Sequence, residues 1–224
     1  MLKFFKKIIV SYEALSNEKT INAYTQQLRS LKEIWNDKTY GLERIFRIFL
    51  CLIHFIYPTL LVKNISGKFS SLARKLSVEF YIILKLFLPV FVIASGLYRY
   101  PVAIILIVYL LSETIFNILS LIFLSDVYPA TLSYRRSLLF LFLNYIEVVL
   151  DFSIIYLGLD LLNEKLPALS VVYFSFVTNT TLGFGEYYPK PGLGQVVVIF
   201  QLIIFILFIL LFINYFSSKI NNKD

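Results

Sequence analysis

The stretch Thr180–Pro189 reads TTLGFGEYYP and lies between two long apolar runs. Gly183 and Gly185 alternate with Leu182 and Phe184, and only the glycines adopt positive φ angles without strain. This alternation breaks a helix and lets successive main-chain carbonyls point the same way. The chemistry open to the stretch is coordination by main-chain oxygen atoms.

The rest of the sequence offers few groups for side-chain chemistry. His54 is the only histidine, which removes most histidine-based catalytic and zinc-site schemes, and we expect it on a helix face. Cys51 is the only cysteine, so neither an intrachain disulfide nor a cysteine metal cluster is possible. We expect no enzyme activity and no cofactor.

The composition indicates an integral membrane protein. Hydrophobic residues occupy 58% of the 224 positions, charged residues 16%, and the mean hydropathy is +0.77, outside the usual range of soluble domains. Backbone polar groups must be paired inside lipid, so helices are the expected spanning elements. The net charge of +7 comes from cations beside apolar segments, which favours an anionic inner leaflet over nucleic acid as a partner.

Four apolar windows are long enough to cross the roughly 30 Å hydrocarbon core as helices. They are residues 80–97, 102–124, 139–161 and 195–216. A tight turn at residues 96–101 joins the first two. Residues 46–62 are apolar but short and contain His54 and Pro58, so this segment either spans or lies in the interface.

Loop charge predicts the topology, because cytoplasmic loops are enriched in Lys and Arg. The relevant cations are Lys63, Lys68, Arg74, Lys75, Arg135, Arg136, Lys219 and Lys223. Their loops are predicted to be cytoplasmic, whereas the turn at 96–101 and residues 165–194 face outside. If residues 46–62 also crossed, the seven cations of residues 1–41 would be external. We therefore predict four full spans in the cell membrane with both termini cytoplasmic.

A short apolar helix is predicted before the glycines. Pro167 suits the first turn of a helix, and residues 168–178 allow three turns but cannot cross a membrane. The chain would enter the membrane as a helix and return to the same side as an extended strand. Such backbone is tolerated at membrane depth only when protein shields it or it lines a watery path.

This stretch resembles the pore loop of potassium channels. The residues that match the T-x-G-(Y/F)-G filter are Thr181, Leu182, Gly183, Phe184 and Gly185, and the similarity covers residues 139–217. In that family, rings of oxygen replace the water shed by a potassium ion. The resemblance implies that the carbonyls of residues 181–184 and the Thr181 hydroxyl form stacked ion sites, with the Leu182 and Phe184 side chains packed behind. One chain supplies one strand and the ring needs four, so a homotetramer is implied.

The resulting fold class is an all-α membrane protein with a potassium-channel-type pore unit plus about two accessory transmembrane helices. The pore unit comprises outer helix, re-entrant pore helix, filter and inner helix. Residues 1–41 form a basic amphipathic cytoplasmic segment, 42–78 an interfacial or partly buried helix and basic loop, 79–138 the accessory helices, 139–217 the pore domain and 218–224 a cytoplasmic tail. In the first segment, an apolar seam faces the inner leaflet or a partner helix: Ile21, Tyr24, Leu28, Leu31 and Trp35.

The predicted function is a potassium-selective channel. A weakly selective cation channel and a non-conducting membrane scaffold or accessory subunit are the alternatives. Phe184 replaces the commoner tyrosine, and residues 173 and 174 are tyrosine and phenylalanine where many members have two tryptophans, so the cuff around the filter should be more apolar. Glu186 replaces an aspartate and keeps a carboxylate at the mouth. Phe205 stands where many relatives have a hinge glycine, and it either narrows the pore or faces lipid.

Four ionisable residues lie within the predicted spans, where exposure to lipid is costly: Lys85, Glu113, Glu147 and Asp151. Asn144, Glu147 and Asp151 share one helical face, which should point to protein. Lys85 and Glu147 both fall in the cytoplasmic half, so we predict that they meet and attach the accessory helices to the pore unit. A proton relay is the functional alternative. The spans lack the regularly spaced cations of a voltage sensor.

Overall fold

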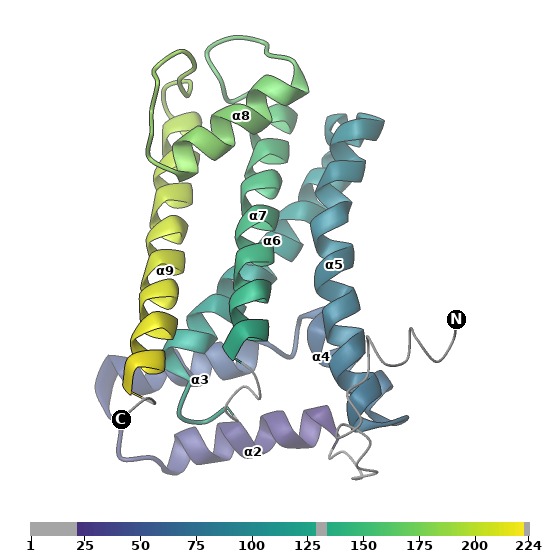
Figure 1. The fold of residues 1–224 in the computed structure, drawn as a ribbon, viewed down its shortest axis with the longest axis vertical. Helices are drawn as coiled ribbons and strands as arrows, with labels where there is room; N and C mark the ends of the chain where they lie inside the picture. Colours follow the sequence, from purple (N-terminus) through teal and green to yellow (C-terminus); the bar gives the residue numbers. More distant parts are fainter. Residues whose placement is uncertain (1–21, 129–133, 222–224) are drawn as a thin grey trace. The chain divides into compact units, whose positions relative to one another are not determined.

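The computed structural model describes residues 22–128 and 134–221 (Figure 1). Regular structure in this part of the chain is helical, apart from an isolated β-bridge between Leu162 and Pro189. Four helices are long and apolar enough to cross a membrane: α5 (Ser71–Ser95), α6 (Pro101–Phe123), α7 (Tyr134–Gly158) and α9 (Leu193–Asn221). The predicted all-α architecture is confirmed, and each predicted span falls on one of these helices.

The helix ends differ from the predicted windows where charge interrupts the apolar run. α5 begins at Ser71 rather than at residue 80, and its first turns carry Arg74, Lys75 and Glu79. α7 likewise begins before the predicted residue 139. Charged side chains lower the local hydropathy without disfavouring helix, so a hydropathy window stops short of the true helix end.

The chain divides into two compact units, Met1–Tyr81 and Ile82–Asp224, and α5 passes from one into the other. In the N-terminal unit, α2 (Ala23–Asn36) packs against α3 (Gly41–Ile53) and α4 (Pro58–Gly67). The Gln27 amide of α2 donates to the Cys51 carbonyl of α3 at 2.9 Å. The buried Arg47 guanidinium pairs with Asp37 at 3.3 Å.

The segment near residues 42–62, predicted as one interfacial or partly buried helix, forms two helices. α3 and α4 are separate helices bent by 60° at a short break. Pro58 is the first residue of α4, and its missing N–H prevents it from continuing α3. His54 is the C-cap of α3, with its Nδ1 2.6 Å from the Leu50 carbonyl oxygen. By length and composition, the bent pair would add a fifth span if its two helices crossed together.

The apolar seam of α2 is not the face that the unit buries, so its contact with the inner leaflet or a partner helix stays a prediction. Ala23, Gln27, Ser30 and Ile34 are buried, whereas Leu28 and Trp35 of the predicted seam are 55% and 62% exposed. Ile21 lies outside the described residues. The buried face is displaced by one residue from the predicted seam.

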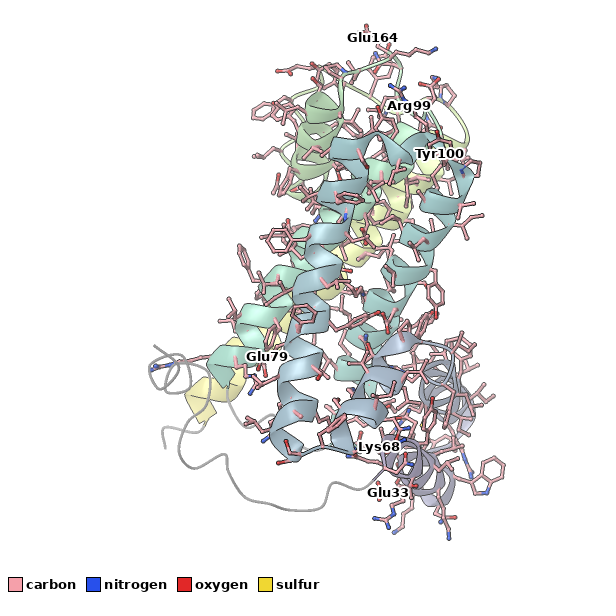
Figure 2. The ribbon with its side chains drawn as sticks, turned by 90° about the vertical axis from the view of Figure 1, so that its right-hand side faces the viewer. Glu33, Lys68, Glu79, Arg99, Tyr100 and Glu164 are labelled. Carbon is pink, nitrogen blue, oxygen red and sulfur yellow. The ribbon has the colours of Figure 1, made fainter. Side chains whose placement is uncertain are left out.

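In the C-terminal unit, α7 is the central helix. It packs against α6, α9, α8 (Ala168–Asn179) and the short 3-10 helix η2 (Leu97–Arg99). The core includes Ile118 of α6, Val148 and Phe152 of α7, and Ile204 and Phe208 of α9. Figure 2 shows Arg99, Tyr100 and Glu164 at one end of this unit, so the turn after α5 and the loop after α7 lie on the same side.

Gly158 ends α7 where it approaches α6 and η2. A Cβ atom at this position would lie 2.5 Å from Ile104 Cδ1 and 2.8 Å from the Tyr98 carbonyl oxygen. Only glycine allows such a close approach without displacing main chain.

Candidate functional site

α8 is the short apolar helix predicted before the glycines, and it lies across one end of α7 and α9 (Figure 1). Pro167 is its N-cap, one position before the predicted first turn. At the other end, the Thr180 N–H donates to the Phe176 carbonyl at 2.9 Å and the Leu182 N–H to the Val177 carbonyl at 3.1 Å. These bonds turn the chain, which then climbs to the end of the unit before α9 begins (Figure 1).

The glycine stretch, residues 180–186, has an alternating backbone. Thr181, Gly183 and Gly185 have φ angles of 58°, 56° and 83°, whereas Leu182 and Phe184 between them have negative φ. Glycine adopts positive φ without steric cost, so the two glycines permit this alternation. The positive φ predicted at both glycines is confirmed. Thr181 adds a third left-handed residue that its residue type did not predict.

The carbonyl oxygens of four residues in this stretch lack a partner in the described part of the chain. Those of Thr181, Leu182, Gly183 and Phe184 accept no hydrogen bond from any residue that the structure describes. The Thr180 hydroxyl donates to the Phe176 carbonyl at 2.9 Å, whereas the Thr181 hydroxyl has no such bond. Residues 181–184 are exposed on the single chain, so this row of oxygens is available to solvent or to a bound species.

A short apolar helix, an oxygen-bearing re-entrant strand and two flanking spans therefore follow one another in the C-terminal unit. Residues 138–222 match a family model described as "Ion channel". These residues are an ion channel pore domain. The family predicted from the sequence is confirmed for this part of the chain. Comparisons with curated proteins and with solved structures gave no match.

Aromatic side chains of α8 make ring contacts on both sides of this helix, and one of them involves the glycine stretch. Phe184 stacks on Tyr173 of α8 with ring centroids 6.4 Å apart and planes 4° apart. Tyr187 meets the same ring edge-on at 6.5 Å. Phe174 turns the other way and packs edge-to-face on Tyr156 of α7 at 5.2 Å. These contacts are ring against ring, and the apolar cuff around the filter stays a prediction.

Behind α8, four residues form a polar brace that ties the pore helix to both spans of the domain: Val149, Tyr156, Ser175 and Gln201. The Gln201 amide of α9 donates to the Ser175 hydroxyl at 3.0 Å and to the Ser175 carbonyl at 3.1 Å. The Ser175 hydroxyl donates to the Val149 carbonyl at 2.7 Å, and the Tyr156 hydroxyl donates to Gln201 Oε1 at 2.6 Å. The brace is buried.

We did not predict the brace, although two residue types in the sequence indicate it. Gln201 is a polar residue inside an otherwise apolar span, and Ser175 interrupts an apolar helix. Polar side chains at membrane depth usually hydrogen-bond to a neighbouring helix. Their partners depend on how far α9 is rotated against α8, which residue types alone do not reveal.

A clamp closes the base of the loop that holds the glycine stretch. The Asn163 N–H donates to the Tyr188 carbonyl at 3.0 Å, and the Lys190 N–H donates to the Leu161 carbonyl at 2.7 Å. The Lys190 ammonium also lies 2.5 Å from Asp160 Oδ2. This hydrogen bond, aided by the charges of Lys190 and Lys165, lowers the pKa of Asp160.

The ionisable residues of the spans form a charged cluster of Lys85, Glu113, Glu147 and Asp151. Lys85 Nζ lies 3.1 Å from Glu147 Oε1, which confirms the predicted meeting of these two residues. Glu113 Oε2 is 3.5 Å from the same ammonium. Thr114 bridges the pair, accepting from Lys85 at 2.5 Å and donating to Glu147 at 3.1 Å. The cluster therefore joins α5 and α6 to α7.

On the inner helix α9, Phe205 packs against Tyr145 of α7 with ring centroids 6.2 Å apart. Its ring is therefore engaged inside the chain. Ile209 and Ile213 are exposed on the single chain, where they face lipid or a pore.

Proposed function

We propose that the protein is a potassium-selective channel in which four copies of the chain surround one pore. The unpaired carbonyl oxygens of Thr181, Leu182, Gly183 and Phe184 are the observation that carries this proposal. A potassium ion in a narrow path loses its water and needs several oxygens in its place. A homotetramer supplies four at each level, and Gly185 completes the filter strand.

The two threonines have separate roles in this proposal. The Thr180 hydroxyl is held by α8 and fixes the start of the strand. The Thr181 hydroxyl is available and forms the innermost ion site with the Thr181 carbonyl. The C-terminal end of α8 lies next to this site, and its negative dipole favours a cation there.

The alternating backbone makes Gly183 the decisive position for a test. Gly183 and Gly192 both have positive φ, at 56° and 85°, and a Cβ atom added at either position would meet no neighbouring atom within 4 Å. Alanine is strained to a similar degree at both positions. Only Gly183 lies in the filter, so Gly192→Ala is a matched control for Gly183→Ala.

The experiment is a reversal-potential measurement on the full chain in planar bilayers with potassium and sodium gradients. A potassium-selective current should reverse near the potassium equilibrium potential, which shifts by roughly 59 mV per tenfold gradient. Gly183→Ala should abolish selective current while Gly192→Ala retains it. Absence of current from well-folded tetramers would favour a non-conducting scaffold instead.

A weakly selective cation channel is the second candidate, and the cuff is the observation that favours it. Phe184 stacks on Tyr173 without a hydroxyl to brace the filter from behind. A reversal potential that follows sodium as well as potassium would support this candidate.

For the N-terminal unit, we propose contact with anionic lipid of the inner leaflet, with both termini cytoplasmic in the cell membrane. α3 exposes apolar side chains at spacings of three and four: Leu42, Ile45, Phe49 and Leu52. Lys63, Lys68, Arg74 and Lys75 belong to the same unit and add positive charge, which favours anionic lipid. Trp35 is the only tryptophan and is exposed, so brominated lipid should quench its fluorescence in the reconstituted protein. Unquenched emission would contradict lipid contact.

A further inference from the structure

The charged cluster contains more acid than base. Lys85 is 4% exposed, and Glu113, Glu147 and Asp151 are each 1% exposed. Three ionised carboxylates beside one ammonium would leave two uncompensated negative charges in a buried site. Such charges are so poorly solvated that a buried group usually becomes neutral instead.

Lys85 is already engaged by groups other than Asp151. Its ammonium has three hydrogens, and its neighbours are Glu147 Oε1, Thr114 Oγ1 and the Leu110 carbonyl at 3.1, 2.5 and 3.1 Å. Glu113 adds a further carboxylate at 3.5 Å. Lys85 therefore compensates the two glutamates first.

Asp151 is the residue that remains without a partner. It makes no hydrogen bond or ion pair with any described residue, and its Oδ2 atom is fully enclosed. Glu147 of its own helix and Lys85 of α5 are the charged groups that act on it, with Glu113 of α6 beyond them. The described side chains of α8 and α9 include no charged residue, and Arg99 of η2 is exposed.

We propose that Asp151 is a buried proton-binding site and is a neutral carboxylic acid at neutral pH. The proton removes one of the two excess negative charges, and the Lys85 ammonium is then shared between Glu113 and Glu147. A proton fits better than a metal ion because no group of acids in the described part of the chain has the geometry of a metal site. The proposal concerns the folded protein and does not depend on whether the pore conducts.

The site lies on the helix that also supports the pore. Glu147 and Asp151 face α5 and α6, while Val149 of the same helix accepts the Ser175 hydrogen bond of the pore helix. Loss of the proton at alkaline pH would add a buried, unpaired charge next to α5 and α6. The attachment of these helices to α7 should therefore weaken as the pH rises.

The test is infrared difference spectroscopy of the full chain in lipid at about pH 7. Wild type should show the C=O stretch of a protonated carboxyl, a band that ionised carboxylates lack. The band should disappear in Asp151→Asn and persist in Glu147→Gln and Glu113→Gln. Glu164→Gln is the matched control, because Glu164 is exposed at the end of the unit (Figure 2) and should not affect the band.

Each outcome decides the proposal. Loss of the band in Glu147→Gln alone would place the proton on Glu147, and absence of the band from wild type would mean that every acid is ionised; either result overturns the assignment. If Asp151→Asn does not fold, a wild-type band that survives both glutamine variants still assigns the proton to Asp151.

Thermal unfolding gives a second measure. The midpoint of wild type and of Glu164→Gln should fall at alkaline pH, and that of Asp151→Asn should fall less. Equal falls in all three would contradict the link to stability.

Discussion

Two faces of α7 carry polar groups into the interior, and they differ in how completely those groups are paired. On one face, Tyr156 and the Val149 carbonyl join Ser175 and Gln201 in the polar brace, which is neutral and closed at both ends. On the other face, Glu147 and Asp151 enter the charged cluster, where Glu147 Oε2 and Asp151 Oδ2 have no hydrogen-bond partner among the described residues. The two faces support different neighbours.

The difference has a physical meaning. A buried polar network in which every member is bonded restricts movement, because any shift leaves a polar group unpaired. A network with unpaired members is sensitive to protonation and to the loss of any one charge. The brace is therefore suited to hold the pore helix in one position, whereas the cluster makes the attachment of α5 and α6 conditional on charge.

Substitution of Lys85 should have the largest effect on folding stability, because Lys85 is the only cation described in the cluster. Lys85→Glu should destabilise the folded chain by at least about 3–5 kcal/mol, since it leaves buried carboxylates uncompensated. The measurement is the yield and thermal midpoint of detergent-purified protein. The charge-swapped double variant Lys85→Glu, Glu147→Lys should recover much of the loss. Equal damage in the single and double variants would show that the pair does not attach the helices.

Gln201→Leu should have the next largest effect, and it should change ion selectivity rather than the attachment of α5 and α6. It removes both hydrogen bonds to Ser175 and leaves the Tyr156 hydroxyl without an acceptor, at about 1–3 kcal/mol for each unpaired group. In the proposed potassium channel, the tetramer should still assemble, but a loosened pore helix should lower the ratio of potassium to sodium permeability. A loss of about 1.4 kcal/mol in discrimination corresponds to a tenfold fall.

Gln195 provides the control for this variant. It lies on the same helix, but it is exposed and accepts only a long 3.4 Å bond from the Gly192 N–H. Gln195→Leu should leave the permeability ratio unchanged. A brace without a role in the filter would give the same ratio in both variants.

A smaller and more specific effect is expected at Ser175. Ser175 and Ser153 are both fully buried and both donate to the Val149 carbonyl, at 2.7 and 2.9 Å. Ser153 belongs to α7 itself, whereas Ser175 links α8 to α7. Ser175→Ala should therefore cost about 1 kcal/mol and lower selectivity, whereas Ser153→Ala should change neither property measurably. Similar selectivity in the two variants would show that the link between helices is not what matters.

The sequence predicted the spans, the short helix before the glycines and the Lys85–Glu147 contact with good success. These features depend on local information: runs of apolar residues, glycines that tolerate positive φ, and charges that cannot face lipid. Glu147 and Lys85 had to meet something polar, and the topology placed them at similar depth.

The features that were missed depend on rotation and register of helices. Within a membrane, lipid is as apolar as a protein interior, so apolar periodicity does not reveal which face of a helix is buried. Gln201 could not be matched to Ser175 for this reason. Pro58 could have predicted the break between α3 and α4, because proline favours the first turn of a helix. The continuous apolar run around it instead suggested one helix.

The smallest effect is expected at the clamp, which is polar like the brace but lies in water. The hydrogen bond from Lys190 lowers the pKa of the exposed Asp160. The bond therefore stabilises the folded protein fully above the unfolded carboxyl pKa of about 3.9. This stabilisation disappears as the pH falls through the lower folded pKa. Asp160→Asn should therefore leave the thermal midpoint nearly unchanged at neutral pH and moderate salt, because solvent and ions screen exposed pairs. The difference between wild type and variant should shrink further as the pH falls below about 3.9 and through the lower folded pKa of Asp160, beneath which both side chains are neutral. A large midpoint difference at neutral pH would show that the clamp, rather than the buried brace, limits the stability of the pore loop.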